Sequence, residues 1–184
     1  PGARYPWESS VSGEEQCPNW QYADHEIHVT ADVVHGIWHY YQAAGDMEFL
    51  KNALPVLKET ARYWLARVCR KPGGAVTLNG VMGPDEYICL CNNNAYTNFM
   101  AARSLEITAW ALELCGEAAE PGFIEDLRET AQGLMNSVDW SGVIPQCDHF
   151  EDYEEPDFET MWPDRSKPFG GQVSQEYNYR VKAL

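Results

Sequence analysis

Four segments with helical spacing of apolar residues, separated by glycine- and proline-containing breaks, constrain this chain most. Apolar side chains recur at offsets of three and four over residues 30–44, 46–70, 95–114 and 123–135. The first two segments are joined by a short connection, and so are the last two, which is typical of antiparallel helical hairpins. The pattern predicts a mainly α fold, and by itself it does not choose between a bundle, a solenoid and a toroid.

Turn and cap residues set the expected ends of these helices. Thr30 is a plausible N-cap of the first helix, and Gly45 is its expected stop. Pro55 predicts either a kink in the second helix or a separate short helix before it. Residues 71–74 (Lys-Pro-Gly-Gly) end that helix, and residues 75–80 read as a brief strand, one half of a hairpin.

The third helix is expected to bury one apolar stripe. The residues predicted to face inward are Phe99, Ala102, Ile107, Trp110 and Leu114, with Leu105 at the edge of the stripe.

Irregular segments flank the helical body. Residues 1–30 combine prolines and glycines with aromatic residues, and a long loop of this kind inside a compact domain is usually functional. Residues 137–184 carry prolines and aromatics together with an acidic run at 151–155. Two interpretations of this segment stay open: a long ordered excursion and an acidic solvated loop. The expected organisation is one domain, with helical hairpins over 31–136 between these two segments.

Composition excludes several classes of partner. A net charge of −15 disfavours nucleic acid and anionic membranes, and no apolar run approaches the ~20 residues of a membrane span. The six cysteines are expected to be reduced thiols in a cytoplasmic protein. The chain begins without methionine and ends without a stop signal, so we expect it to be a piece of a longer protein.

Two adjacent carboxylates, Asp85 and Glu86, follow the loop-forming pair Gly83-Pro84 and precede three asparagines that can cap the third helix. A short loop held by a helix start is a place where a scaffold can present a general acid. From pattern alone, a plain polar turn is the more common explanation.

The sequence motifs around these carboxylates are more specific than the carboxylate pair itself. Residues 83–87 (Gly-Pro-Asp-Glu-Tyr) and 93–98 (Asn-Asn-Ala-Tyr-Thr-Asn) resemble the catalytic segment of glycoside hydrolase family 65. The resemblance extends upstream to residues 5–9 (Tyr-Pro-Trp-Glu-Ser), 12–15 (Ser-Gly-Glu-Glu) and 26–32 (Glu-Ile-His-Val-Thr-Ala-Asp). That family contains inverting phosphorylases of α-glucosyl disaccharides and related α-glucosidases. The resemblance implies an (α/α)6 barrel, about half of which this chain would supply, with 1–30 as an active-site loop.

Glu86 matches the family's catalytic glutamate, which implies a general acid that protonates the leaving oxygen. To donate at neutral pH it must stay protonated, through burial or through a like charge such as Asp85. We favour a loop-fixing role for Asp85 over direct chemistry. In a phosphorylase, inorganic phosphate attacks directly, so the expected co-substrates are a disaccharide and phosphate, with no cofactor.

Trp7 and Glu8 match a family pair that lines the glucosyl pocket. An indole face packs against sugar C–H groups, while a carboxylate accepts hydrogen bonds from the sugar hydroxyls. The alternative is a core tryptophan beside a surface glutamate. The further substrate-binding candidates are His28, Thr30, Asp32, Asp85 and Tyr87. For His28 and Asp32 the alternative is buried hydrogen-bonded scaffold, and for Thr30 it is an ordinary helix cap.

No metal is expected. Residues 25–28 (His-Glu-Ile-His) have one residue too few for a zinc motif, and the pair His35 and His39, although at i, i+4, lies on an aromatic-rich helix.

The sequence departs from the family pattern at residues 88–91 (Ile-Cys-Leu-Cys), where the family has a histidine and polar or acidic residues. We expect these positions to face the acceptor sugar, so a less polar acceptor, a changed linkage or reduced activity would follow. The family's phosphate or general-base segment lies beyond Leu184. The sequence therefore leaves open phosphorolysis, hydrolysis by an α-glucosidase or trehalase-type enzyme, and an inactive helical fragment; the complete protein is a candidate homodimer.

Overall fold

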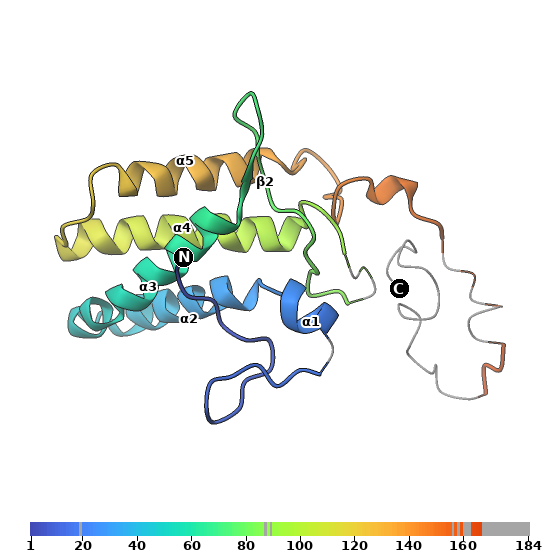
Figure 1. The fold of residues 1–184 in the computed structure, drawn as a ribbon, viewed down its shortest axis with the longest axis horizontal. Helices are drawn as coiled ribbons and strands as arrows, with labels where there is room; N and C mark the ends of the chain where they lie inside the picture. Colours follow the sequence, from blue (N-terminus) through green and yellow to red (C-terminus); the bar gives the residue numbers. More distant parts are fainter. Residues whose placement is uncertain are drawn as a thin grey trace.

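The computed structural model describes residues 1–18, 20–86, 88, 90–155, 157, 159 and 163–166, without the side chains of residues 20 and 21. The chain is mainly helical, as predicted (Figure 1). Its elements, in order, are α1 (Trp20–His25), α2 (Val29–Ala44), α3 (Met47–Arg67), β1 (Cys69–Arg70), β2 (Val76–Thr77), α4 (Ala95–Cys115), α5 (Phe123–Asn136) and the short 3-10 helix η1 (Phe150–Asp152).

Caps define the helix ends largely as the sequence predicts. Gly45 adopts φ 65°, a left-handed conformation that glycine tolerates, and its N–H donates to the Tyr41 carbonyl at the end of α2. Asp46 then caps α3 by accepting from the Phe49 N–H at 2.9 Å. Thr30, in contrast, is no cap: it lies in the first turn of α2, and its Oγ1 accepts from the Tyr5 N–H at 3.0 Å.

Pro55 lies inside one continuous α3, so the alternative of a separate short helix is wrong. Its ring is exposed, and it therefore does not disturb the buried face of the helix. The helix ends at Arg67, earlier than expected, because Cys69–Arg70 pairs antiparallel with Val76–Thr77. The predicted hairpin is present, with two residues in each strand.

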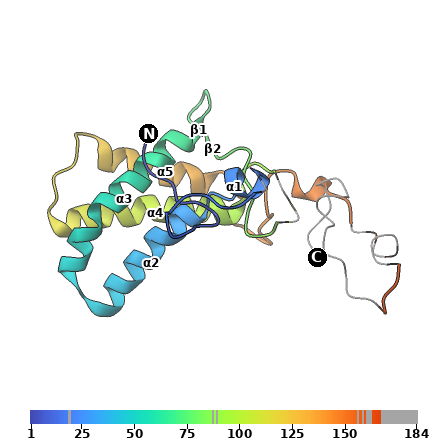
Figure 2. The same cartoon turned by 60° about the horizontal axis from the view of Figure 1, so that its bottom comes forward.

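The helices run alternately along the long axis of the molecule, so α2 and α4 begin at the end where α3 and α5 finish (Figures 1 and 2). Helix α4 contacts α2, α3 and α5. It does so largely through small residues, among them Ala101, Ala109 and Ala111, which are fully buried. Close approach through small side chains places α4 at the centre of the core.

This packing corrects the predicted inward face of α4. Ala102, Leu105 and Ile107 are buried, whereas Phe99, Trp110 and Leu114 are 43%, 37% and 49% exposed. The large side chains are partly exposed, and Trp110 contacts Trp38 of α2 and the Arg103 guanidinium.

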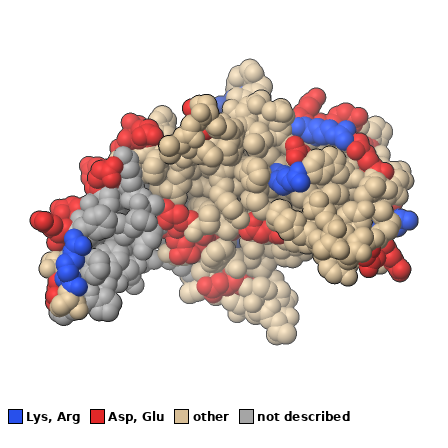
Figure 3. Space-filling view, turned by 180° about the vertical axis from the view of Figure 1, so that it is seen from behind, with Lys and Arg blue, Asp and Glu red and all other residues tan. Residues whose placement is uncertain are grey.

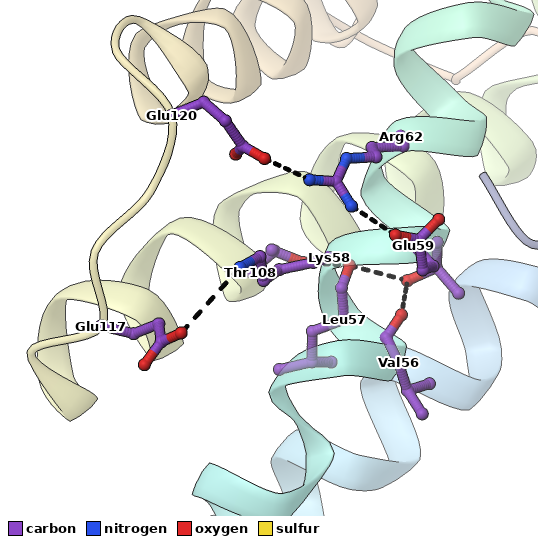
Figure 4. A network of polar contacts seen from close by, with 9 residues as sticks. Val56, Leu57, Lys58, Glu59, Arg62, Thr108, Glu117 and Glu120 are labelled. Carbon is purple, nitrogen blue, oxygen red and sulfur yellow. Dashed lines mark hydrogen bonds and ion pairs between the residues drawn. The ribbon is translucent and has the colours of Figure 1, made fainter. Parts of the chain in front are cut away.

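Ion pairs connect α3 to the residues that follow α4 (Figure 4). Arg62 on α3 contacts Glu59 and Glu120, and Lys58 reaches Glu117 at 3.9 Å. Thr108 of α4 donates to the Leu57 carbonyl of α3 at 3.3 Å. These contacts join α3 to α4 and to the connection that follows it.

Over the described residues, no helix is both long and apolar enough to cross a bilayer. On the face shown in Figure 3, acidic and basic groups are scattered around large uncharged areas. None of the five described cysteines forms a disulfide; Cys89 lies outside the described residues.

Within the described residues of the two flanking segments, the named elements are α1 and η1. Tyr153, one of the aromatics expected to anchor the second segment, packs on the core. Trp162 and Phe169 lie outside the described residues. The boundaries at 30 and 137 stay predictions.

Candidate active site

The loop that carries Glu86 is closed at its base. Val81 and Cys91 exchange two backbone hydrogen bonds of 2.9 Å, which brings the two ends of the loop together. The Met82 N–H donates to the His25 carbonyl at 3.0 Å, and His25 Nδ1 lies 2.7 Å from the Gly80 carbonyl oxygen. The loop therefore rests on the end of α1, directly before Glu26.

Three asparagines bind this loop to the start of α4. Asn92 Oδ1 accepts from the Gly80 N–H at 3.0 Å, and Asn93 Oδ1 accepts from the Leu78 N–H at 3.1 Å. Asn94 caps α4 by accepting from the Thr97 N–H at 3.0 Å, as the sequence predicts. Gly83 lies so close to the Asn94 side chain that a Cβ at position 83 would overlap it. Glycine is thus required there by a close approach.

Asp85 is held from another segment. Its Oδ2 accepts from Gln146 Nε2 at 2.7 Å, and the Gln146 carbonyl accepts from the Ala95 N–H at 2.9 Å. The contact agrees with a loop-fixing role for Asp85. The neighbouring Glu86 is exposed, so the burial expected around its carboxyl is not provided by the described residues.

The positions after Glu86 differ from expectation. Ile88 and Cys91 are buried, Ile88 completely, and only Leu90 among the described three is exposed. Ile88 and Cys91 belong to the core, so in this structure they are not exposed to an acceptor sugar. Tyr87 and Cys89 lie outside the described residues.

The N-terminal segment is organised by one carboxylate. Glu15 accepts backbone hydrogen bonds from Trp7 at 2.7 Å, Glu8 at 3.0 Å and Cys17 at 3.0 Å. Burial opposes ionisation, but these three donors outweigh it and lower the pKa of Glu15. A charged Glu15 therefore closes the loop and fixes the backbone from which the Trp7 indole projects.

That indole reaches a buried histidine. The Trp7 and His28 rings have centroids 5.6 Å apart at an interplanar angle of 76°, and Tyr96 of α4 lies on His28 at 5.3 Å and 88°. His28 Nδ1 is 3.1 Å from Asp32 Oδ2, while the Tyr96 hydroxyl donates to Asp32 Oδ1 at 3.1 Å. Residues from the N-terminal segment, α2 and α4 thus meet around one imidazole.

Electrostatics extend this cluster to the catalytic candidate. Burial works against the His28 cation, but Asp32 and Glu26 outweigh it and raise the pKa of His28 to about 9. Burial raises the pKa of Glu26; His28 lowers it and the Glu86 carboxylate raises it again. Glu86 therefore lies within electrostatic range of a residue that is 3.8 Å from His28. The connection between Trp7 and Glu86 therefore runs through His28 and Glu26.

The predicted site residues fall into two groups. Trp7, His28 and Asp32 come together, with Glu86 linked to them through Glu26. Glu8 is exposed beside Trp7, and Thr30 is fully buried against the N-terminal segment. Roles in sugar binding stay predictions for all of them.

Three residues of this region were not predicted: Glu26, Tyr96 and Gln146. Glu26 and Tyr96 do lie inside the family-like stretches 26–32 and 93–98, which is the signal that could have found them. Gln146 has no local signal, because its partner is 61 residues away.

Among the described residues, no group of three or more histidine, cysteine or acidic side chains could hold a metal ion. His35 and His39 do stand together, with ring centroids 4.0 Å apart.

Comparison with known proteins decides the family. Residues 1–182 match the model of the glycosyl hydrolase family 65 central catalytic domain. The chain belongs to glycoside hydrolase family 65. A kojibiose phosphorylase of Halothermothrix orenii is 33% identical over 194 residues, covering 83% of this chain and 23% of that protein. A kojibiose hydrolase of Flavobacterium johnsoniae is 40% identical over 153 residues, covering 82% of this chain and 22% of that protein.

A solved structure described as a candidate kojibiose phosphorylase from the human microbiome has the same fold. It superposes with a TM-score of 0.79 at 24% identity, covering 98% of this chain and 27% of that one. The likeness confirms that the helical hairpins form part of the family's helical barrel. The chain spans about a quarter of the length of these family 65 relatives.

Proposed function

We propose that the protein containing this chain cleaves an α-glucosyl disaccharide with inversion, using phosphate as the nucleophile and Glu86 as the general acid. The observation that carries the proposal is the placement of Glu86 within electrostatic range of Glu26, in the cluster that contains Trp7. We infer that two segments far apart in sequence supply a proton donor and an aromatic wall to one donor-sugar site. The donor sugar would lie between them.

In the proposed reaction, the Glu86 carboxyl donates its proton to the glycosidic oxygen as the bond from that oxygen to C1 of the glucosyl unit breaks. A phosphate oxygen forms the new bond to C1 from the opposite face. The products are β-glucose 1-phosphate and the released acceptor sugar, and Glu86 is left as a carboxylate that regains a proton from water. No cofactor enters this balance.

Hydrolysis by the same acid is the second candidate, because one relative with 40% identity is named a hydrolase and others are named phosphorylases. In that case water replaces phosphate, and a second carboxylate must activate it from ~6.5–9.5 Å away. Asp85 is bonded to Gln146, which argues against its serving as that base.

Incubating the complete enzyme with kojibiose, with and without inorganic phosphate, separates the two. Phosphate-dependent release of β-glucose 1-phosphate supports phosphorolysis, and phosphate-independent release of glucose alone supports hydrolysis. In either case Glu86→Gln should lower kcat by roughly 10²–10⁴, the usual contribution of a general acid. Unchanged turnover in this variant would end the assignment of Glu86.

The acceptor is the less constrained half of the substrate. Of the described residues after Glu86, Leu90 is the one exposed apolar side chain of the loop. A panel of kojibiose, trehalose, maltose and nigerose identifies the linkage, and a change of preference in Leu90→Ser would place this residue at the acceptor.

A further inference from the structure

We propose that Glu26 is a positioning residue, which acts through His28 on the Trp7 indole and thereby on the affinity for the donor sugar. The inference rests on the proposed function in one respect, because it takes Trp7 to be the wall of the donor pocket.

Glu26 is in an unusual environment for a carboxylate. It is 1% exposed, and neither of its oxygens has a hydrogen-bond partner among the described residues. The cation nearest to it in an ion pair is His28, with Oε1 and Nε2 3.8 Å apart. A buried carboxylate without hydrogen bonds is costly unless a cation compensates it, so the two groups stabilise each other's charge.

His28 is held on both sides. Asp32 contacts Nδ1 at 3.1 Å and Glu26 faces Nε2, so the imidazole is kept in one orientation as a cation. The Trp7 and Tyr96 centroids lie 5.6 and 5.3 Å from the imidazole centroid, within the range of cation–π attraction. We infer that the charge on His28 favours the observed position of the indole, since the two rings are in edge contact at this distance.

Other charged and titratable groups surround this arrangement. Asp32 on α2 contacts His28, and Tyr96 on α4 donates to Asp32. Glu86 acts electrostatically on Glu26, and His25 and Arg67 both bond the Gly80 carbonyl at the base of the loop that carries Glu86. Glu26→Gln removes one of the two carboxylates that face His28 and leaves the Asp32 contact to Nδ1 in place. Removing the Glu26 charge should make His28 lose its proton at lower pH.

The test is sugar binding in the complete enzyme, measured without turnover. Glucose is titrated calorimetrically into Glu86→Gln and into Glu86→Gln/Glu26→Gln between pH 6 and 10. We expect the dissociation constant of the first variant to rise roughly three- to thirty-fold as pH passes about 9, the loss of one cation–π contact. In the double variant, the rise should come at least about one pH unit lower. Superimposable profiles would mean that Glu26 is merely structural.

Two further variants complete the design. His28→Gln in the Glu86→Gln background should bind glucose weakly at every pH, and a persistent rise near pH 9 would overturn the role of His28. Glu120→Gln, a matched change at an exposed ion pair, should leave the profile unchanged. If the Glu26 variant does not fold, a flat profile for Glu86→Gln alone still rejects the inference.

The outcomes also separate this inference from the proposed function. Full activity in Glu86→Gln would overturn the general acid, whereas the pH profile of glucose binding tests Glu26 whether or not Glu86 is the acid.

Discussion

Gln146 donates its side-chain amide to Asp85 at 2.7 Å, although the two residues are 61 positions apart. The same Gln146 accepts from the first turn of α4 through its carbonyl. The carboxylate beside the catalytic candidate is therefore part of the support of the loop.

This relationship predicts that Asp85→Asn is mild. The asparagine Oδ1 can still accept from Gln146, so kcat should fall by less than about tenfold, against the roughly 10²–10⁴ expected for a general acid. Steady-state rates of the complete enzyme measure the difference. Asp85→Ala, which leaves the Gln146 amide without this acceptor, is the matched comparison and should cost more. A collapse of kcat in Asp85→Asn would instead give Asp85 a direct chemical role.

Trp7 should contribute through its ring. Trp7→Ala removes an aromatic surface, and we expect kcat/KM to fall by roughly 10- to 100-fold, as for the loss of one buried aromatic contact. Trp7→Phe keeps a ring beside His28 and should lose much less. Equal losses in the two variants would show that an aromatic ring at position 7 is not sufficient. The contribution would then require the indole itself, on the backbone that Glu15 holds in place.

The raised pKa of His28 predicts that the free energy of unfolding depends on pH. Burial disfavours the cation, but Asp32 and Glu26 outweigh it and raise the pKa of His28 from 6.5 to about 9. A raised pKa stabilises the fold fully below the unfolded value of 6.5, and the gain is lost as pH rises through about 9. Its upper limit is about 3 kcal/mol.

Thermal unfolding between pH 6 and 10 measures this effect. His28→Gln should have a lower Tm than the parent at pH 6, and the difference should shrink towards pH 10. A Tm difference that is independent of pH would mean that His28 acts by packing alone.

Two helical glycines should respond to alanine with opposite signs. A Cβ at Gly36 of α2 has nothing within 4 Å, so Gly36→Ala should stabilise the fold by up to about 1 kcal/mol through helix propensity. A Cβ at Gly133 of α5 would overlap Val76 of β2, and overpacking typically costs about 1–3 kcal/mol, which exceeds the propensity gain. Gly133→Ala should therefore lower Tm, and Gly133→Ala/Val76→Ala should recover part of the loss. Stabilisation by Gly133→Ala alone would contradict this close contact.

Local signals account for what could be predicted of the fold. Helix periodicity, the stop at Gly45 and the cap at Asn94 are properties of neighbouring residues, and the helices lie close to where these signals put them. The inward face of α4 could not be predicted in the same way. This helix is apolar on most sides, and its small residues, not Phe99 or Trp110, allow three other helices to approach.

In the candidate site, too, some residues have local sequence signals and others depend on distant partners. Trp7 and Glu86 could be found because they lie in short family-like stretches. The roles of Glu26 and Gln146 depend on partners that only the folded chain supplies: a buried imidazole in one case and a distant loop in the other. Thr30 was placed at a helix cap by its residue type, yet its hydroxyl bonds the N-terminal segment.

The close approach of Gly83 to Asn94 has a consequence for engineering. The peptide from 80 to 94 would not keep its conformation if it were transplanted alone. Its conformation depends on hydrogen bonds with the first turn of α4 and with the loop around Gln146. A graft of this loop onto another scaffold would have to carry all three segments together, and the orientation of Glu86 would then follow that of the recipient helix.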